Sequence, residues 1–285
     1  MTDPSAVSSA LAARWHTNLP IEVAYWNVWM DSHGRQWAED PDAAEREFDE
    51  RFDPEMSLQQ NLRALIDAIP GTVVRILDVG AGPATSVGKV WPGRSVAITA
   101  IDPLADVYRQ LLRAHGLTPP VITRTGTGET INALFASTFR FDLAHARNAL
   151  DHAWDPVVSI TNMVQAVAPG TGVVYLLHHE REGERRKYGG LHQWNFVAHR
   201  EEFLVEAPGI PAVNITQELA SEVVTSRVRQ IDGDIEVVFR RRPHPTPHFV
   251  PIEQLGQVVT RIRELEAEVD RLEAARDRAL GRRSP

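Results

Sequence analysis

Residues 75–86 read RILDVGAGPATS, and this stretch decides the fold. Its first half is a short apolar run of the kind that forms a buried β-strand, and Gly80 and Gly82 follow where that strand ends. Because glycine has no side chain, the backbone of this turn can approach a ligand closely before the next helix begins. The stretch therefore predicts a strand, a tight turn and a helix around a nucleotide-like ligand.

Further β-prone runs follow at spacings that leave room for helices between them. With the first strand they are Val73–Val79, Val96–Ile101, Pro120–Thr123, Phe141–Ala146 and Gly172–His178. This alternation predicts an α/β fold with a mostly parallel sheet covered on both faces. Near the end, 222–230 and 235–241 flank Asp232-Gly233, a dipeptide suited to a tight turn, so we expect an antiparallel hairpin to finish the sheet.

Two acidic residues stand at the ends of neighbouring predicted strands. Asp78 comes shortly before Gly80, where a carboxylate can pair with the amino group of an amino-acid moiety. Asp102 closes the next strand, where an acid is placed to accept hydrogen bonds from both hydroxyls of a ribose. A dinucleotide fingerprint would need a third glycine at position 85, which is Thr85 here. The pattern therefore favours a ligand that joins an amino acid to a nucleoside.

These residues resemble the first two motifs of the class I S-adenosylmethionine-dependent methyltransferases. The likeness continues through residues 125–129, similar to the loop that borders the adenine, through 141–156, similar to the fourth strand and its loop, and through 168–170, similar to the turn before the fifth strand. It covers roughly residues 73–179. The resemblance implies a Rossmann-like class I methyltransferase fold and S-adenosylmethionine as the cofactor. The cofactor-binding residues that we expect are Asp78, Gly80, Gly82, Asp102, Pro103, Gly128, Glu129, Arg147 and Asn148.

The segment 146–152, ARNALDH, lies at the carboxyl end of a predicted strand, where an open α/β sheet places its ligands. Methyl transfer to an alcohol requires removal of a proton, and a histidine with a pKa of about 6.5 can accept one. We expect His152 to be this general base, with Asp151 orienting it or binding a divalent ion such as magnesium. Two alternatives stay open: His152 packs in or orients its loop, and Asp151 caps a helix.

Two later segments are candidates for the acceptor pocket. Residues 178–180 read HHE after a predicted strand, and residues 188–196 read YGGLHQWNF after a charged loop. A tryptophan beside side-chain amides suits sugar recognition, although an ordinary loop anchored by one aromatic residue would look the same. The histidines are also candidate metal ligands with Asp151 or Glu180. The substrate contacts that we expect are Trp26, Trp29, His179, His192 and Trp194.

The chain divides into four predicted parts. A helical cap spans 1–70, the cofactor-binding catalytic domain 71–242, a proline-rich linker 243–251 and an amphipathic helix 252–285. The cap is tryptophan-rich and we expect it to cover the cofactor cleft, unless its tryptophans are purely structural. The last helix has heptad-like spacing and either packs on its own domain or forms a coiled coil with another chain, which would make a homo-oligomer.

The composition limits the classes of partner. A net charge of -8 repels polyanions, and the basic runs 185–187 and 240–242 are short, so no nucleic-acid partner is expected. With 0 cysteines the chain forms no disulfide and no cysteine metal site, which fits a cytoplasmic protein. No apolar run reaches the roughly 20 residues of a membrane helix. We therefore expect no membrane partner.

The segments 148–152 and 190–196, with the trailing charged helix, are similar to the sugar O-methyltransferases of bacterial polysaccharide pathways, of the actinobacterial methylmannose-polysaccharide type. This resemblance implies transfer to a small hydroxyl acceptor, a sugar or oligosaccharide. The alternatives are a phenol, polyketide or carboxylate acceptor, a nucleic-acid or protein acceptor, and a noncatalytic cofactor-binding assembly protein. A nicotinamide dehydrogenase is disfavoured by Thr85.

Overall fold

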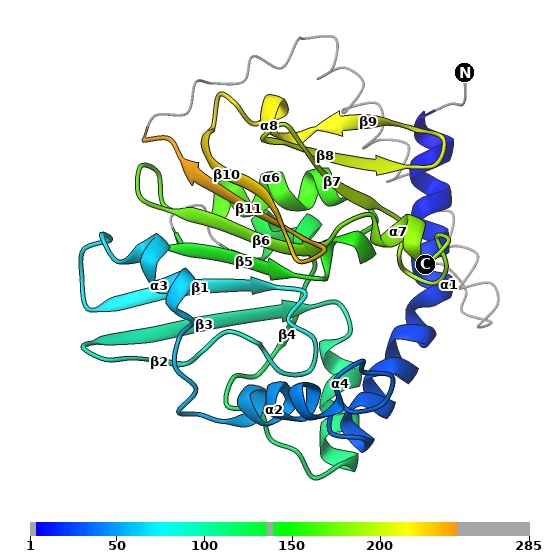
Figure 1. Ribbon diagram of the computed structural model, residues 1–285, viewed down its shortest axis with the longest axis vertical. Helices are drawn as coiled ribbons and strands as arrows, with labels where there is room; N and C mark the ends of the chain where they lie inside the picture. The colour runs from blue at the N-terminus through cyan, green and yellow to red at the C-terminus, as the bar shows by residue number, and fades with distance from the viewer. Residues whose placement is uncertain (1–3, 136–138, 244–285) are drawn as a thin grey trace, which may run out of the picture. The chain divides into compact units, whose positions relative to one another are not determined.

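The computed structural model describes residues 4–135 and 139–243 (Figure 1). The predicted linker beyond residue 243, the helix 252–285 and its coiled-coil pairing lie outside the described residues. In the part of the chain that is described, no helix has the length and apolar character needed to cross a membrane.

A mostly parallel sheet forms the centre of the described chain. Its order is β10-β11-β6-β5-β1-β3-β2, and β4 pairs with β3. Neighbours among β1, β3, β4, β5 and β6 run parallel, while β11 runs antiparallel to β6 and β10 antiparallel to β11. The strands are β1 (Val73–Val79), β2 (Val90–Trp91), β3 (Arg94–Asp102), β4 (Arg124–Thr125), β5 (Leu143–Arg147), β6 (Val173–His179), β10 (Val223–Ile231) and β11 (Asp234–Arg241). The predicted α/β sheet with a closing antiparallel hairpin is confirmed.

The central strands are buried on both faces, which explains their continuous apolar sequences. Successive residues of β1 point to opposite sides: Leu77 and Val79 belong to one core cluster, and Val74 and Ile76 belong to another. Since β1 lies between β3 and β5, the chain order reverses at the β1/β5 pair. Ligands of open α/β sheets bind outside the carboxyl ends of the strands at such a reversal.

Helices cover both core clusters and the carboxyl edge of the sheet. Helix α6 adds apolar side chains to the cluster of Leu77, and α3 adds them to that of Val74. Figure 1 shows the long helix α1 running across the ends towards which β1 and β5 point. The helices are α1 (Pro4–Asp31), α2 (Pro41–Phe52), α3 (Gln60–Ile66), α4 (Ala105–Ala114), α5 (Ile131–Leu134), α6 (Pro156–Ala166), α7 (Glu182–Arg185) and α8 (Ile215–Glu218), with 3-10 turns at Gly128–Thr130 and Leu150–His152.

A second, antiparallel sheet separates β6 from β10 along the chain, and the sequence analysis did not predict it. It consists of β7 (Asn195–His199), β8 (Glu202–Ala207) and β9 (Ile210–Asn214), in the order β7-β8-β9. Phe196, Phe203 and Val205 point from it into the main core cluster. The alternating burial of β8 is the pattern of a strand with one covered face.

One predicted strand was misplaced. The run 120–123 forms no strand, and the short strand β4 begins just after it, at Arg124. The chain before β4 contains Pro119 and Pro120, which lack the amide hydrogen that a ladder requires.

Candidate functional site

The turn after β1 depends on its two glycines. Gly80 and Gly82 have φ angles of +69° and +63°, in the left-handed region that side chains disfavour. A Cβ atom on Gly80 would lie 2.3 Å from the Cβ of Ala149, and one on Gly82 would lie 2.8 Å from the Trp26 ring. The turn is therefore packed against the loop after β5 on one side and against α1 on the other.

Asp78 is buried at the end of β1 and is held from two sides. Its Oδ1 lies 2.7 Å from Nδ1 of His145, and its Oδ2 accepts a hydrogen bond from the Thr85 hydroxyl. The hydroxyl of Thr85 in turn accepts from the amide of Val87, 3.0 Å away. Asp78 thus holds the segment after the glycine turn through the Thr85 hydroxyl. A glycine at position 85 has no side chain and could not make these bonds.

Asp102 at the end of β3 binds the same glycine turn. Its Oδ2 accepts from the amide of Gly82 at 3.1 Å, and its Oδ1 accepts from the amide of Leu104 at 2.9 Å. Burial raises the pKa of Asp102 to about 7, although these two backbone bonds act in the opposite direction. The carboxyl group beside the turn therefore titrates near neutral pH.

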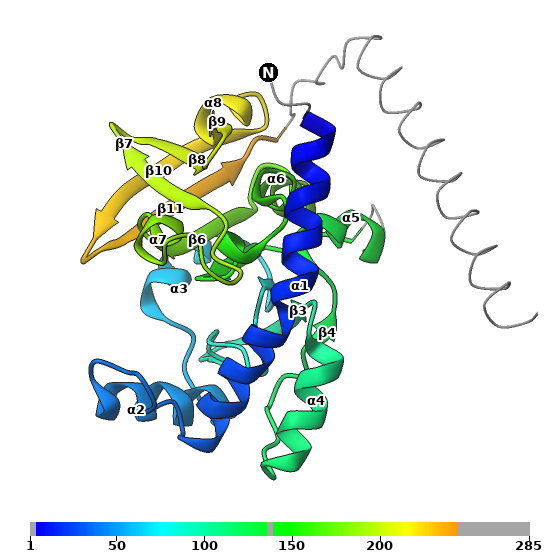
Figure 2. The same cartoon turned by 90° about the vertical axis from the view of Figure 1, so that its right-hand side faces the viewer.

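A cavity of about 640 Å³ opens at these strand ends, beneath α1. Figure 2 shows α1 passing in front of β3 and β4. Fourteen of the sixteen predicted site residues line this one cavity, and Gly82 and Trp194 do not. Those that line it are Trp26, Trp29, Asp78, Gly80, Asp102, Pro103, Gly128, Glu129, Arg147, Asn148, Asp151, His152, His179 and His192.

Asp151, His152 and His192 form a cluster at one side of the cavity. Nδ1 of His192 lies 2.8 Å from Oδ2 of Asp151 and 3.1 Å from Nε2 of His152. Burial lowers the pKa of His152, but the carboxylates of Asp151 and Glu22 raise it by more, so it lies above its ordinary value. Burial acts to raise the pKa of Asp151, and the neighbouring histidines overcome this and hold it well below its usual range.

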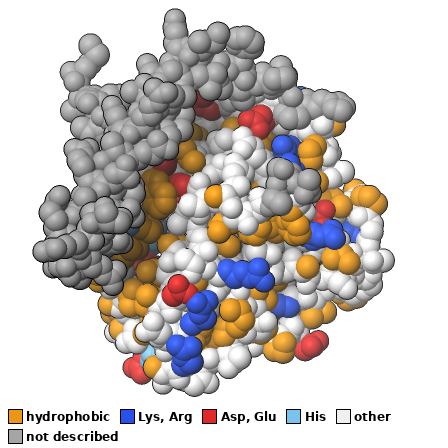
Figure 3. All heavy atoms as spheres, turned by 180° about the vertical axis from the view of Figure 1, so that it is seen from behind, with side chains coloured by type: hydrophobic (Ala, Val, Ile, Leu, Met, Phe, Trp, Pro, Cys, Tyr) orange, Lys and Arg blue, Asp and Glu red, His pale blue; other side chains and the backbone are white. Residues whose placement is uncertain are grey.

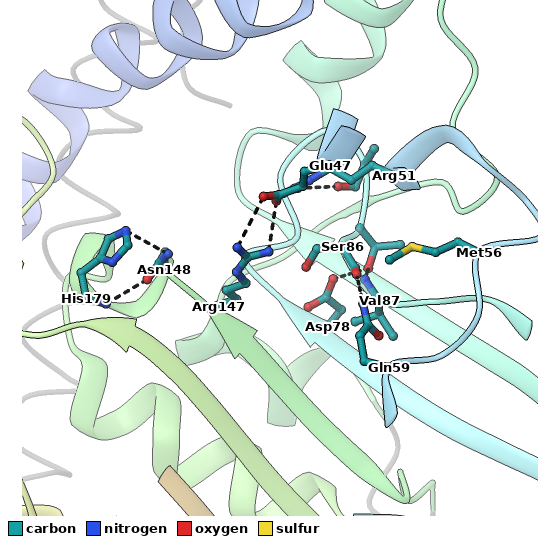
Figure 4. A network of polar contacts seen from close by, with 12 residues as sticks. Glu47, Arg51, Met56, Gln59, Asp78, Ser86, Val87, Arg147, Asn148 and His179 are labelled. Atoms are coloured by element: carbon teal, nitrogen blue, oxygen red, sulfur yellow. Dashed lines mark hydrogen bonds and ion pairs between the residues drawn. The ribbon is translucent and has the colours of Figure 1, made fainter. Parts of the chain in front are cut away.

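Arg147, at the end of β5, makes an ion pair that the sequence analysis missed. Its Nη1 lies 3.0 Å from Oε1 of Glu47 on α2, and that same oxygen lies 2.7 Å from Nη2 of Arg51 (Figure 4). Arg51 also donates to the carbonyl of Ala84 at 2.9 Å, in the segment after the glycine turn. Burial acts to raise the pKa of Glu47, but the two guanidinium groups lower it below its usual range.

Asn148 and His179 tie the ends of β5 and β6 together. Asn148 has a positive φ of 47°, and its side-chain oxygen accepts from the amide of His179 at 3.0 Å. Its Nδ2 lies 3.1 Å from Nε2 of His179 (Figure 4). Nδ1 of His179 lies 2.5 Å from Oδ1 of Asp234. The carboxylate at position 234 therefore orients a histidine of the cavity wall.

Trp194, which we expected to contact a substrate, is buried outside the cavity wall. Its indole N–H donates to the carbonyl of Ala153 at 2.8 Å, and the amide of Gln193 donates to the carbonyl of Asp151 at 3.1 Å. These two bonds fasten the segment that carries His192 to the segment that carries His152. In this structure Trp194 holds the wall together and has no face towards the cavity.

Several residues of the cavity wall carried no signal in the sequence. Glu22 of α1 accepts from the Trp26 indole at 2.8 Å and lies 3.7 Å from Nδ1 of His152. The cap was expected to cover the cleft, but nothing in the sequence singled out Glu22 within it. The other lining residues that were not predicted individually include Trp15, Tyr25, Glu47, Arg51, Glu182 and Arg186.

Comparison with known proteins gives a likeness only to solved structures, since no family model and no curated protein matches the chain. N-methyltransferase NodS from Bradyrhizobium japonicum, in complex with S-adenosyl-L-homocysteine, is 17% identical over 76% of this chain and 100% of that one, with a TM-score of 0.43. The N-terminal domain of EvdMO1, crystallised with S-adenosylhomocysteine and D-fucose, is 23% identical over 67% and 83%, with a TM-score of 0.38. An O-methyltransferase family protein from Burkholderia thailandensis is 13% identical over 78% and 71%, with a TM-score of 0.39. At these scores the likenesses establish neither the ligand nor the activity of this chain.

Proposed function

We propose that this chain is an S-adenosylmethionine-dependent O-methyltransferase that acts on a small hydroxyl acceptor, a sugar or oligosaccharide. One observation carries the proposal. A single cavity holds Asp102 and Gly80 at the ends of β3 and β1, and it also holds His152 after β5. Groups suited to an amino-acid nucleoside therefore share one space with a group suited to accept a proton.

The residues of the cavity fit the cofactor. Gly80 has no room for a Cβ, so the backbone there is kept bare, and Asp102 keeps acceptor capacity beyond its two backbone bonds. When bound, the cofactor supplies a methyl group on a sulfonium, which is already a good leaving group. In this proposal the residues that hold it are Asp78, Gly80, Asp102, Pro103, Gly128, Glu129, Arg147 and Asn148. Gly82 lies outside the cavity wall and contributes by letting the turn pass beneath the Trp26 ring.

The contacts of Asp78 and Arg147 make their proposed roles in cofactor binding more specific. Asp78 is occupied by His145 and Thr85, so it acts chiefly by fixing the turn and offers only its remaining lone pairs to an amino group. Arg147 is paired with Glu47, so a carboxylate of the bound cofactor would compete with Glu47 for this guanidinium. Positioning by such contacts supplies the larger part of catalysis in a transfer of this kind.

His152 is the proposed general base. Its Nε2 faces the cluster of Asp151 and His192, and its Nδ1 faces Glu22. His152 would accept the proton of the acceptor hydroxyl as that oxygen forms its bond to the methyl group, and the cofactor, when bound, would supply this methyl group and retain the electron pair of the broken C–S bond. A positioned base contributes roughly 100-fold to 10,000-fold.

A sugar acceptor is supported by the mixture of aromatic and polar groups in the wall. Trp26 and Trp29 line the cavity with aromatic rings, and His179 and His192 line it with imidazole rings. With Trp194 outside the wall, Trp15 is the aromatic side chain that replaces it in this proposal.

Transfer of a radiolabelled methyl group tests the proposal. The acceptor panel comprises saccharides, phenols, small acids and peptides, each with and without magnesium. We expect label in a saccharide, and we expect His152→Ala to lower turnover by about 100-fold or more while leaving affinity for S-adenosylhomocysteine near that of the parent chain. His199→Ala is the matched control, because His199 is exposed on β7 and does not line the cavity.

The outcomes separate the parts of the proposal. Label in a phenol or acid alone would reject the sugar acceptor, and unchanged turnover in His152→Ala would place the base elsewhere. Cofactor binding without transfer to any acceptor would support a noncatalytic assembly protein instead.

A further inference from the structure

We infer that Asp151, His152 and His192 bind one divalent transition-metal ion such as Zn²⁺. The three atoms that face one another are Oδ2 of Asp151, Nε2 of His152 and Nδ1 of His192, separated by 2.8, 3.1 and 3.5 Å. Zinc bonds to nitrogen and oxygen are about 2.0–2.2 Å long, so neighbouring ligand atoms of a tetrahedral ion lie about 3.3–3.6 Å apart. The longest edge of the triangle already lies in this range. The two shorter edges would reach it by lengthening about 0.2–0.5 Å, which small side-chain rotations allow.

Hydrogen bonds alone do not satisfy this triangle. The carboxylate oxygen only accepts, and each ring nitrogen carries either one proton or one lone pair. A proton on Nδ1 of His192 can point at Asp151 or at His152 but not at both, and a proton on Nε2 of His152 would reach Asp151 only at 3.5 Å. Hydrogen bonding therefore gives the triangle one short, well-directed bond and leaves the third atom without one. A cation between the three atoms would be bound by a lone pair from each of them.

The surroundings hold the three side chains in place. The bonds from Gln193 to Asp151 and from Trp194 to Ala153 join the two segments that carry the cluster. Nδ1 of His152 lies 3.7 Å from the Glu22 carboxylate, longer than a hydrogen bond, and a small shift of either side chain would form the carboxylate–histidine bond that usually supports a metal ligand. The three ligands thus come from a fixed wall, while all of them also border the cavity.

The ligand set selects the class of metal. Imidazole nitrogens suit zinc, copper, iron and nickel, whereas magnesium prefers oxygen ligands and keeps several waters. Two imidazoles with one carboxylate therefore favour a transition metal over the magnesium that the sequence analysis allowed for. Because the three ligands leave one side open to the cavity, the ion would keep positions for water or an acceptor oxygen.

Metal binding would occupy Nε2 of His152, the residue that is the proposed base. A nitrogen that coordinates a metal has no lone pair left for a proton, so Nδ1, which faces Glu22, would be the nitrogen of the metal-loaded His152 that can still accept one. The inference itself does not require the transfer reaction. Metal binding can fail while S-adenosylhomocysteine still binds at Asp102, and the reverse also holds, so the two proposals fail separately.

Calorimetric titration of the tag-free, chelator-treated full chain with Zn²⁺ tests the inference, with Mg²⁺ in a parallel titration. We expect Zn²⁺ to bind with far higher affinity than Mg²⁺. Since even the supports behind a metal ligand change affinity by about 10-fold to 100-fold, His192→Ala should weaken Zn²⁺ binding by more than about 100-fold. Glu22→Gln, which alters only the support, should weaken it by about 10-fold to 100-fold.

Two further variants make the result decisive. His199→Ala removes an exposed histidine from β7 and should leave the Zn²⁺ affinity unchanged. Asp151→Asn keeps the size of its side chain and decides the matter if thermal melts show that His192→Ala does not fold. Absence of Zn²⁺ binding, or a Zn²⁺ site that survives both His192→Ala and Asp151→Asn, would overturn the inference.

Discussion

Asp102 gives cofactor binding its expected pH dependence. Burial raises its pKa to about 7, so the side chain is ionised above this pH and protonated below it. An ionised carboxylate accepts stronger hydrogen bonds from ribose hydroxyls than a protonated one. Binding that requires the ionised form should therefore strengthen by about tenfold between pH 6 and pH 8. Calorimetry with S-adenosylhomocysteine measures this, and the same gain in Asp102→Asn would contradict it.

Gly80 and Gly93 form a matched pair for measuring the cost of a side chain at the glycine turn. Both have a positive φ, +69° and +83°, but a Cβ on Gly80 would collide with Ala149 whereas nothing lies within 4 Å of one on Gly93. Gly93→Ala should thus cost about 1–2 kcal/mol from the backbone alone. Gly80→Ala should cost a further 1–3 kcal/mol or so from overpacking. Urea unfolding measures both, and equal losses would show that the packing against Ala149 is soft.

Trp194 connects two segments of the fold, and we expect this connection to contribute to stability. Its indole N–H joins the loop after β5 to the chain that leads into β7. Trp194→Phe keeps a ring but leaves the Ala153 carbonyl without this donor, which should cost about 1–3 kcal/mol of stability. Trp37→Phe, at an indole that is 66% exposed, should change stability by less than about 0.5 kcal/mol. Thermal melts compare the two, and similar effects would mean that the tether is unimportant.

Helix α1 closes the cavity with one face. Trp26 covers Gly82, and Glu22, one turn earlier in the same helix, reaches towards His152. Side chains at i and i+4 lie on one helix face, and the bond between this pair fixes both of them. A lid role for α1 is therefore part of the proposed function, because the same face touches both the glycine turn and the proposed base.

The residues that line the cavity come from helix α1 through residue His192, and only the folded state brings them together, so a ligand of the cavity must stabilise the folded state. At a concentration of about 100 times its Kd, a ligand adds about 2.7 kcal/mol. For a chain of this size, that corresponds to a rise in Tm of roughly 5–10 °C. We expect S-adenosylhomocysteine to produce this shift and NADH to produce none, because Thr85 stands where a dinucleotide site needs glycine. A shift with NADH alone would favour a dehydrogenase.

Sequence reasoning was strongest where the structure is local. Strand β1, from Val73 to Val79, has the predicted bounds, and the glycine turn follows it as expected. It was weaker for the chain after β6, where no element was predicted and a sheet of three strands forms. The reason is that β7 and β8 are stable only against the core of the first sheet, a contact that no short segment encodes.

The sequence by itself determined which residues stand at the ends of the strands. Asp78, Asp102 and Asn148 lie at or just after the ends of strands that the apolar side chains of those strands predict. Parallel neighbouring strands bring such ends to the same edge of the sheet. Only the tertiary structure decided which side chains pair with one another in the wall of the cavity. Arg147 meets Glu47 across 100 positions and His152 meets His192 across 40, and such contacts depend on how helices and loops pack over the sheet.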